Sequence, residues 1–439
     1  MDERRTRRGA GVGGPARAAA TLRIARLGAR GDGIAELAGR PVYVAGALPG
    51  ELVEVALGAP RGDGVAARLG TILEPSPERR APPCRHFGDC GGCALQHLSD
   101  DAYGAWKHRQ LAETLARAGL VPAPLSPLVR IAAATRRRVD LVAERRRGRV
   151  GLGFHERGSY RLVDIAQCAI LRPGLQALLA PLRAALEPVL AEGTSVDLLA
   201  TDGDAGIDLL VRAPRPPTLA ARQALAGLAS ANVIARIAWQ EPGQPAEPIA
   251  LLRRPTVSLA GIMVEPPPGA FLQASAEGEA ALVQAALALL PRRGRIADLH
   301  AGCGTFSFAV ATAAPEVTVR AIEGDGAALD ALLAAARRSG LSDRIIGEHR
   351  DLAANPPQAA ELSRFSAVLF DPPRAGAREV AAALARSRVA RIVAVSCNPT
   401  SFARDARLLV EGGYRLGEVT PIDQFVWSPH LELVAEFSR

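Results

Sequence analysis

From about residue 270 to the C-terminus, apolar strand-like segments alternate with helical segments, and this alternation constrains the fold more than any other feature of the chain. RIADLHAGCGTFSFAVA and VTVRAIEGDGAALDALLAAARRSGL each combine a strand, a glycine-containing turn and a helix. FSAVLFDPPRAGA and RIVAVSCNP are two further strands that end in polar loops. Alternating β and α units predict a doubly wound sheet with parallel strands at its centre, and such sheets bind ligands at the carboxyl ends of their strands.

The chain is long enough for several domains, since its 439 residues exceed what one hydrophobic core holds. Residues 1–20 are basic and lack the apolar stretch of a secretory signal, which predicts a disordered tail. Short strand-like runs broken by Gly and Pro predict a small N-terminal β-barrel over residues 21–75. Residues 76–265 mix strands and helices as an α+β central domain does, and residues 266–439 carry the doubly wound pattern. The predicted fold class is multidomain α/β.

Arginine supplies nearly all of the positive charge. The formal net charge is +8, Lys107 is the one lysine, and residues 136–138 and 145–147 are runs of arginine. Such an excess favours a polyanionic partner, because neutralising phosphates releases counterions, although a GC-rich genome would also yield many arginines. Aromatic residues are only 4% of the chain, which argues against a broad base-stacking platform. No uncharged apolar run of about 18 residues occurs, so no membrane span is expected.

The motif DLHAGCGTF, Asp298 to Phe306, places a glycine turn between a strand and a helix. Such a turn lets the backbone approach a ligand. The next strand ends at Glu323, about 20 residues on, where a carboxylate can accept hydrogen bonds from ribose hydroxyls. The pyrophosphate-binding pattern G-x-G-x-x-G would have a third glycine where this chain has Ser307. S-adenosylmethionine, which has no pyrophosphate, is therefore favoured over NAD.

Two further strands end in residues with reactive side chains. LFDPPR holds Asp371 in a rigid Pro-Pro loop, and VAVSCNP brings Cys397 to the carboxyl end of the next strand. Most free cysteines are inert apolar core residues, but one at this position faces the predicted ligand crevice and is a candidate nucleophile. Arg374 follows the prolines where amino-group methyltransferases often carry an aromatic residue, which argues against methyl transfer to nitrogen.

A thiolate beside a methyl donor suits the methylation of uracil. Addition of the sulfur to C6 gives C5 the carbanion character that it needs to take a methyl group, and a base must then remove the C5 proton so that the sulfur can leave. Glu432, in the segment SPHLELVAEF, is the candidate base, with an exposed acid on a terminal strand as the alternative interpretation.

Cysteines crowd into CRHFGDCGGCALQH, where Cys84, Cys90 and Cys93 follow the spacing C-x5-C-x2-C. The chain is long, poor in cysteine and without a signal peptide, so we expect a reducing cytoplasm and favour metal binding or catalysis over disulfides. Cys168 offers a fourth thiol. Zinc and iron–sulfur clusters both accept four thiolates, and the spacing leaves zinc, iron–sulfur and chance open.

In their order along the chain, these motifs resemble the RNA uracil-C5 methyltransferases, specifically the bacterial ribosomal branch that bears an iron–sulfur cluster. The resemblance rests on the strand-rich N-terminal region followed by CRHFGDCGGCALQH, DIAQCAIL, FLQAS, DLHAGCGTF, FDPPRAG, SCNPTSFARD and HLELV. It implies a TRAM-type, OB-like barrel at the N-terminus and a Rossmann-like S-adenosylmethionine-dependent methyltransferase domain at the C-terminus.

The resemblance also implies roles for individual residues. Cys397 is similar to the family nucleophile, and Glu432 to the base that takes the C5 proton. Four cysteines look like the ligands of a [4Fe-4S] cluster: Cys84, Cys90, Cys93 and Cys168. Six residues look like the S-adenosylmethionine pocket: Gln273, His300, Thr305, Glu323, Asp351 and Asp371. The chain departs from the family pattern at His300 and Thr305, where an apolar residue and Asn are more familiar, and Cys303 in the glycine turn is interpreted as structural.

The implied substrate is a loop uridine of 23S ribosomal RNA that leaves its stack to reach Cys397, with the arginine-rich central domain presenting the RNA. Transfer RNA is the nearest alternative substrate, but the related enzymes usually lack both the barrel and the cluster cysteines. Cytosine-C5 enzymes tend to carry a Pro-Cys pair in the loop that holds Asp371 here, which disfavours them. The presence of both Cys397 and Glu432 disfavours an inactive RNA-binding protein. The protein is expected to be a cytoplasmic monomer.

Overall fold

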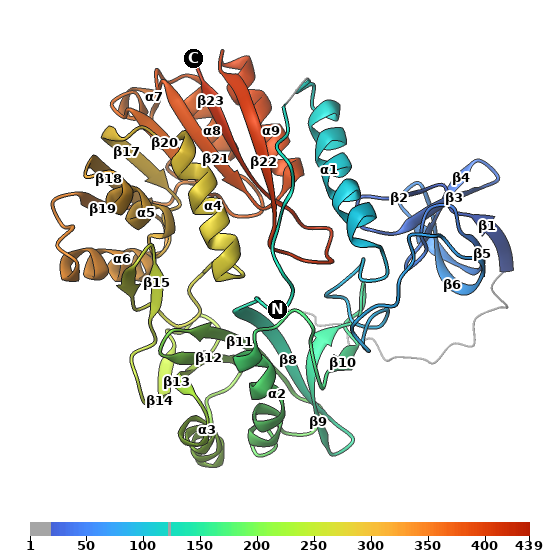
Figure 1. The fold of residues 1–439 in the computed structure, drawn as a ribbon. Helices are drawn as coiled ribbons and strands as arrows, with labels where there is room; N and C mark the ends of the chain where they lie inside the picture. Colours follow the sequence, from blue (N-terminus) through green and yellow to red (C-terminus); the bar gives the residue numbers. More distant parts are fainter. Residues whose placement is uncertain (1–18, 122–123) are drawn as a thin grey trace, which may run out of the picture. The chain divides into compact units, whose positions relative to one another are not determined.

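The computed structural model describes residues 19–121 and 124–439 and separates into two compact units (Figure 1). Of the described residues, the first unit comprises residues 19–81 together with Ala94–Ala102, and the second comprises those of Pro82–Cys93 and Tyr103–Arg439. Most of the predicted tail, residues 1–18, lies outside the described residues. The end of that predicted tail already belongs to the first strand, which begins at Ala19.

The first unit is built on one six-stranded sheet with the order β1-β5-β6-β4-β3-β2. Its strands are β1 (Ala19–Arg23), β2 (Arg26–Leu27), β3 (Gly33–Leu37), β4 (Arg40–Val44), β5 (Leu52–Arg61) and β6 (Gly64–Glu74). Neighbouring strands are antiparallel except β4 and β6, which run parallel. Alternate residues such as Val42 and Val44 are buried, so the sheet has a small apolar core of its own. Closure into a TRAM-type barrel stays a prediction.

A seven-stranded sheet with the order β10-β9-β8-β11-β12-β13-β14 lies in the second unit. Its strands are β8 (Arg138–Arg146), β9 (Arg149–His155), β10 (Leu162–Asp164), β11 (Ser195–Gly203), β12 (Gly206–Arg212), β13 (Ile234–Gln240) and β14 (Glu247–Leu251). Two helices, α2 (Pro173–Ala185) and α3 (Leu219–Ala231), pack leucines against the sheet. The helices begin where local signals predict, since Pro173 occupies the first turn of α2 and Thr218 caps α3.

An eight-stranded sheet with the order β19-β18-β17-β20-β21-β23-β22-β7 carries the doubly wound pattern. Its strands are β7 (Val129–Arg130), β17 (Arg293–Leu299), β18 (Glu316–Glu323), β19 (Ile345–His349), β20 (Ala367–Phe370), β21 (Arg391–Ser396), β22 (Arg415–Asp423) and β23 (Glu432–Ser438). Strands β19 to β21 are parallel, which confirms the predicted centre, and β23 is antiparallel to its neighbours. The strand order reverses at β17 and β20, whose carboxyl ends mark the usual ligand site of such sheets.

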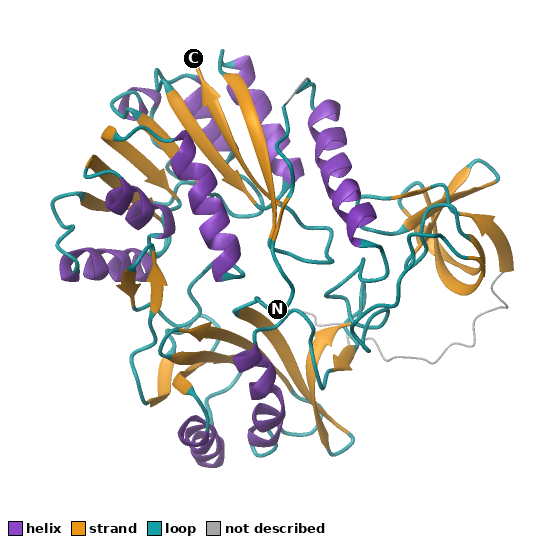
Figure 2. Cartoon of the chain, in the orientation of Figure 1, coloured by secondary structure: helices purple, strands orange, loops and turns teal. Residues whose placement is uncertain are grey.

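Helices cover both faces of this sheet (Figure 2). They are α1 (Asp100–Arg117), α4 (Ala276–Leu289), α5 (Thr305–Ala313), α6 (Gly326–Arg338), α7 (Ala359–Leu362), α8 (Arg378–Ala385) and α9 (Pro399–Glu411). Helices α4, α5 and α6 share one apolar core with the sheet, and α1, α7, α8 and α9 share the other. The central strands β20 and β21 are almost continuously apolar because both of their faces are buried. In the part of the chain that the structure describes, no helix is long and apolar enough to cross a membrane.

Parts of the range assigned to the central domain contribute to this eight-stranded sheet. Strand β7 forms its edge by pairing with β22, and α1 buries Leu111 and Leu115 in one of its cores. The hairpin of β15 (Val257–Leu259) and β16 (Ile262–Val264) packs into the other core. Strand β7 is two residues long, so no alternation of apolar and polar residues could have signalled it.

Candidate active site

Cys397 lies in the link between the carboxyl end of β21 and the start of α9. Buried apolar residues hold β21 within the sheet. The chain turns into a helix because Asn398 Oδ1 accepts a hydrogen bond from the Thr400 N–H, while Pro399 suits the first helical position. The Cys397 side chain is half-buried. The candidate nucleophile is therefore fixed by a strand and a helix cap and remains partly accessible.

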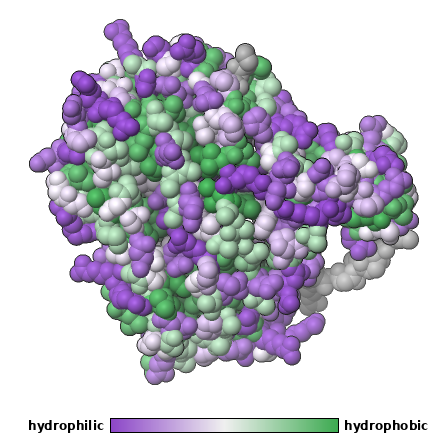
Figure 3. Space-filling model, in the orientation of Figure 1, coloured by the Kyte–Doolittle hydropathy of each residue, from purple (hydrophilic) through white to green (hydrophobic). Residues whose placement is uncertain are grey.

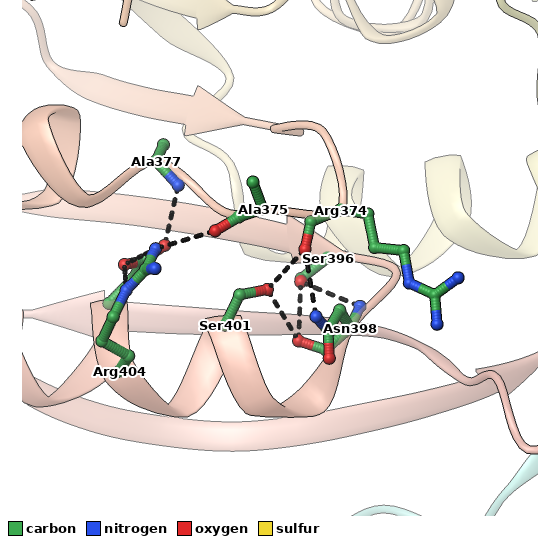
Figure 4. A network of polar contacts seen from close by, with 8 residues as sticks. Arg374, Ala375, Ala377, Ser396, Asn398, Ser401 and Arg404 are labelled. Atoms are coloured by element: carbon green, nitrogen blue, oxygen red, sulfur yellow. Dashed lines mark hydrogen bonds and ion pairs between the residues drawn. The ribbon is translucent and has the colours of Figure 1, made fainter. Parts of the chain in front are cut away.

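A network of polar contacts joins this link to the Pro-Pro loop that follows β20 (Figure 4). Asn398 Nδ2 and Ser401 Oγ both donate hydrogen bonds to the Arg374 carbonyl, at 3.0 and 3.1 Å. Ser396 Oγ donates to the Asn398 carbonyl at 3.3 Å. The Arg374 guanidinium points away from these contacts, and its Nη2 lies 3.1 Å from Nδ1 of His430. The backbone of one loop is thus held by side chains of the other.

The Pro-Pro loop is fixed again a few residues later (Figure 4). Asp405 Oδ2 accepts a hydrogen bond from the Ala377 N–H at 2.8 Å, and Arg404 Nη2 donates to the Ala375 carbonyl at 3.0 Å. Between these two contacts, Gly376 has a φ of +81°, and a Cβ there would lie 2.5 Å from the side chains of Arg404 and Asp405. The position therefore requires glycine, for both its backbone angle and its lack of a side chain.

Glu432 lies beside Cys397 because of the strand register. Strand β23 is antiparallel to β21 with Leu433 opposite Ser396, so the next pair along the two chains is Glu432 and Cys397. Glu432 is only 3% exposed, which rules out the interpretation as an exposed terminal acid. Its Oε1 accepts a hydrogen bond from Gln424 Nε2 at 3.0 Å, and its Oε2 is buried with no hydrogen-bond partner among the described residues.

Two glutamines connect Glu432 to Asp371. Gln424 Nε2 also donates a hydrogen bond to Gln273 Oε1 at 2.8 Å, and Gln273 Nε2 donates to Asp371 Oδ2 at 3.1 Å. Asp371 follows β20, Gln273 precedes α4 and Gln424 follows β22. The structure thus brings four of the predicted site residues together with one that was not predicted, Gln424.

Burial and mutual repulsion shift the pKa values of the acidic groups in this site. Burial raises the pKa of Glu432 from 4.5 to about 7. Burial, and then the charge of Glu432, raise the pKa of Asp371 well above 3.8. Burial, with the charges of both carboxylates, raises the pKa of the Cys397 thiol to about 12, while Arg374 opposes this rise. At neutral pH Glu432 is close to half-ionised, as suits a group that accepts a proton and releases it again.

The glycine turn after β17 and the acid at the end of β18 lie together. Gly302 and Gly304 have φ angles of +55° and +103°, which glycine adopts without strain. Glu323 Oε2 accepts a hydrogen bond from the Gly302 N–H at 2.8 Å. Thr305 is the first residue of α5, directly after the turn. This grouping has the parts that the sequence predicts for a nucleoside site: a close backbone approach and a carboxylate for the ribose.

His300 stands at the start of the same turn. It has a φ of +64°, and its N–H donates a hydrogen bond to the Ile322 carbonyl at 3.0 Å. Burial lowers the pKa of the His300 imidazole, and the charges of Glu323 and Asp351 oppose this change. Asp351 is exposed, and its Oδ1 accepts two backbone N–H groups of its own turn. The three predicted cofactor residues are therefore close enough to interact electrostatically.

The sequence analysis missed two residues of this region, Gln424 and Asp298. Asp298 is 2% exposed, accepts a hydrogen bond from Ser307 Oγ at 2.6 Å, and has a pKa that burial raises to about 7. A charged residue that interrupts an apolar strand just before a glycine turn could have marked Asp298. Gln424 follows the end of β22 and stands before the apolar residues Phe425 and Val426, and no local pattern distinguishes it from an ordinary loop residue.

The predicted cluster cysteines belong to the second unit and lie beside β9, β10 and α2. Cys90 forms an isolated bridge with Glu156, just after β9, and the Cys168 N–H donates a hydrogen bond to Gln176 Oε1 at 2.7 Å. Cys90 and Cys168 pack against the core of the seven-stranded sheet. Burial is the main cause that raises the pKa of both thiols, and the thiol of Cys84 raises them further. These three cysteines are therefore near neighbours.

None of the six cysteines, all of which lie among the described residues, forms a disulfide. Over residues 19–121 and 124–439, no group of three or more His, Cys, Asp or Glu side chains is arranged to hold a metal ion. Cys84, Cys90 and Cys168 lie near one another, and the metal site stays a prediction. Cys303 is 3% exposed in the core of the eight-stranded sheet, as expected of a structural residue.

The two arginine runs have different surroundings. Arg137 is 4% exposed, and its Nη2 lies 2.6 Å from Oε2 of Glu279 on α4, so it is a structural residue. Residues 145–147 lie at the hairpin between β8 and β9, where the Arg146 side chain is 72% exposed. Hydrophilic residues are widely spread over the face shown in Figure 3, between smaller hydrophobic patches. Arg146 and Arg147 of the hairpin run are exposed and can meet a polyanion.

Proteins similar to this chain match nearly its whole length. An uncharacterized RNA methyltransferase of Caulobacter vibrioides is 42% identical, over 95% of this chain and 99% of the relative. The 23S rRNA (uracil(1939)-C(5))-methyltransferase RlmD of Chromohalobacter salexigens is 37% identical, over 95% of this chain and 89% of the relative. The family model for tRNA (Uracil-5-)-methyltransferase matches residues 358–437, which include Asp371, Cys397 and Glu432. The chain belongs to the RNA uracil-5-methyltransferase family.

The fold of this uracil-5-methyltransferase is shared with a solved structure, the tRNA (uracil-54, C5)-methyltransferase of Pyrococcus abyssi in complex with S-adenosyl-L-homocysteine. The TM-score is 0.75, and the match covers 95% of this chain and 99% of that chain at 22% identity. The likeness shows the multidomain α/β fold. The predicted membership of the RNA uracil-C5 methyltransferase family is confirmed, whereas the iron–sulfur branch stays a prediction.

Proposed function

We propose that this methyltransferase uses S-adenosylmethionine to methylate C5 of a loop uridine in 23S ribosomal RNA. The observation that carries the proposal is the placement of Glu432 next to Cys397, with Asp371 joined to Glu432 through two glutamines. The 37% identity to RlmD of Chromohalobacter salexigens supports ribosomal RNA as the substrate. The exposed Arg146 and Arg147 suit contact with RNA phosphates, and the target uridine would flip out of its stack to reach Cys397.

Cys397 is the proposed nucleophile. Its thiol gives its proton to solvent water, and the sulfur then bonds to C6 of the uracil while the C5=C6 electron pair moves toward the C4 carbonyl oxygen as an enolate. Burial disfavours the thiolate, so the positive charge of Arg374, which lowers the thiol pKa, assists this step. The hydrogen bonds from Asn398 and Ser401 to the Arg374 carbonyl support the nucleophile and this arginine as one unit.

Glu432 is the proposed base. Once C5 carries the methyl group, its proton passes to Glu432, the C5=C6 double bond forms again, and the bond between C6 and sulfur breaks to return the thiolate. A carboxylate with a pKa of about 7 is a stronger base than one with the ordinary value of 4.5, yet it is still substantially ionised at neutral pH. Its Oε2 has no partner among the described residues and is the oxygen available for the proton.

The residues around the glycine turn fit S-adenosylmethionine. The left-handed Gly302 and Gly304 let the backbone approach a ligand, and the Glu323 carboxylate can accept hydrogen bonds from ribose hydroxyls. When bound, this cofactor supplies a sulfonium methyl group that a C5 carbanion can attack. The residues proposed to hold it are Gln273, His300, Thr305, Glu323, Asp351 and Asp371. Gln273 and Asp371 also belong to the hydrogen-bonded chain that reaches Glu432, so the pocket and the base share one network.

We also propose that Cys84, Cys90, Cys93 and Cys168 hold a [4Fe-4S] cluster. Four thiols are the donor set of such a cluster, and the electrostatic interaction of Cys84 with Cys90 and Cys168 is what closely placed ligands would show. No step of the reaction passes through the cluster. A reducing compartment such as the cytoplasm would keep these thiols reduced and able to bind iron, and the protein would act there as a monomer.

The variant Cys397→Ala tests the proposed function. It is expected to bind 23S ribosomal RNA fragments like the wild type, but to transfer no methyl group and to form no covalent adduct with 5-fluorouridine RNA. Thr400→Ala, at an exposed position in the same turn, is the matched control. It is expected to retain both methyl transfer and formation of the covalent adduct. Normal methylation by Cys397→Ala would overturn the mechanism. If the wild type methylates transfer RNA and not ribosomal RNA, the substrate is transfer RNA. If it methylates neither RNA, it is an inactive RNA-binding protein.

A further inference from the structure

We propose that Gln424 is a positioning residue for the reaction: its side-chain amide holds Glu432 in the state and orientation that accept the C5 proton. This inference rests on the proposed function. Gln424 lies directly after β22, which ends at Asp423, and it is 5% exposed. Strand β22 pairs with β23 so that Ile422 is opposite Glu432, and the backbone therefore fixes where the Gln424 side chain begins.

The Gln424 amide has both of its protons in use. Its Nε2 lies 3.0 Å from Glu432 Oε1 and 2.8 Å from Gln273 Oε1. Because Gln273 accepts this hydrogen bond at Oε1, its amide group is oriented so that its Nε2 donates to Asp371 Oδ2 at 3.1 Å. Each carboxylate thus receives one amide N–H. Reversing the Gln424 amide would place its oxygen against a carboxylate oxygen. Glu432 and Asp371, at the two ends of this row of hydrogen bonds, therefore fix the orientation of both amide groups.

This arrangement divides the two oxygens of Glu432 between two tasks. Oε1 is occupied by the Gln424 amide, and Oε2 is buried without a partner among the described residues. A hydrogen bond donated to a carboxylate favours the charged form, which is the form that acts as a base. Gln424 opposes the burial that raises the pKa of Glu432. Without Gln424 a larger fraction of Glu432 would be protonated at neutral pH, and the base would be held less firmly.

The variant Gln424→Met tests the inference, because methionine has a similar size and no amide. Single-turnover reactions with unmodified RNA would follow two steps separately: formation of the methylated covalent adduct at Cys397, and its resolution to free enzyme and 5-methyluridine. We expect adduct formation close to that of the wild type and resolution slowed about fivefold or more at pH 7, with the adduct accumulating. A loss of one hydrogen bond to a charged group corresponds to a pKa rise of about one unit or more, so the rate should recover near pH 9.

Ser428→Ala is the matched control. Ser428 is buried in the same segment, and its Oγ donates a hydrogen bond to the Phe425 carbonyl and accepts one from the His430 N–H, so neither bond involves the Glu432 carboxylate. It should disturb the segment while leaving the pH dependence of resolution unchanged. If Gln424→Met resolves its adduct at the wild-type rate at every pH, or is slowed equally at pH 7 and pH 9, the inference is wrong. If the wild type forms no adduct with 23S ribosomal RNA or with transfer RNA, the proposed function itself fails.

Discussion

Lys107 on α1 and Asp423 at the end of β22 form an ion pair in which Nζ lies 3.0 Å from Oδ1, and each side chain is only 1% exposed. The hydroxyl of Tyr103 donates a hydrogen bond to the other Asp423 oxygen at 2.7 Å, and Lys107 Nζ also donates to the His430 carbonyl. Asp423 ends one strand, and His430 stands two residues before Glu432. The pair therefore ties α1 to both ends of the segment that carries Gln424.

Removing one partner of this pair should be costly. Lys107→Met leaves the Asp423 carboxylate buried without its cation, and we expect the free energy of unfolding to fall by roughly 3 to 5 kcal/mol. Urea unfolding monitored by tryptophan fluorescence would measure the change. Lys107→Met combined with Asp423→Leu removes both charges and should recover part of the loss. A single variant within about 0.5 kcal/mol of the wild type would contradict the importance of the pair.

Glu432→Gln should stabilise the protein at alkaline pH while abolishing the release of methylated RNA. The folded pKa of Glu432 is raised from 4.5 to about 7, so above pH 7 the fold keeps a charge buried that the unfolded chain exposes to water. The neutral amide removes a destabilisation of roughly 3 kcal/mol, given about 1.4 kcal/mol for each unit of pKa. This benefit should shrink as the pH falls from 7 to 4.5, because the folded protein then binds the proton first.

Thermal unfolding of the wild type and of Glu432→Gln at pH 8 and pH 5 would check this pH dependence. The difference between the two proteins should be large at pH 8 and mostly lost at pH 5. An equal difference in stability at the two pH values would show that burial does not destabilise the charged form of Glu432.

The sequence predicts the doubly wound sheet because its signals are local. Apolar runs, glycine turns and helix caps each act within a few residues, and Gly302, Gly304 and Asn398 lie where those rules put them. The contribution of β7 and α1 to the same sheet could not be predicted. That contribution depends on pairing across almost 300 residues, as between Ile422 and Val129, and no local pattern encodes it.

The sequence predicts which residue types belong to the candidate site. It does not predict their spatial arrangement, their burial or the hydrogen bonds between them. Cys397 and Asp371 are marked by strand ends, whereas the position of Glu432 beside Cys397 follows from the antiparallel register of β23 on β21. The burial of Glu432, and with it the raised pKa, is a property of the assembled site. The proposed role of Gln424 depends on its hydrogen bonds to Gln273 and Glu432. The sequence alone does not show these contacts, so it could not identify Gln424 as a site residue.

Asn398 should matter for both the stability of α9 and the placement of the nucleophile. Its Oδ1 caps the helix, and its Nδ2 donates to the Arg374 carbonyl at 3.0 Å (Figure 4). Asn398→Ala should cost about 1 kcal/mol of stability through the lost cap and should also slow adduct formation with 5-fluorouridine RNA. Asn398→Ser keeps a capping oxygen and loses the reach to Arg374. A serine variant with normal stability and slow adduct formation would separate the two roles, and one with a wild-type rate would show that the contact to Arg374 is dispensable.

Iron content offers a test of the cysteine site that does not depend on catalysis. Protein purified without oxygen should be brown, with iron and sulfide bound in proportion to the chain. Replacing any one of Cys84, Cys90, Cys93 or Cys168 by serine should reduce the bound iron sharply. Cys303→Ser should keep the wild-type iron content, because Cys303 lies in the core of the eight-stranded sheet, away from these four thiols. Stoichiometric zinc with no iron would refute the cluster, since four thiolates hold zinc equally well and only the bound metal distinguishes the two sites.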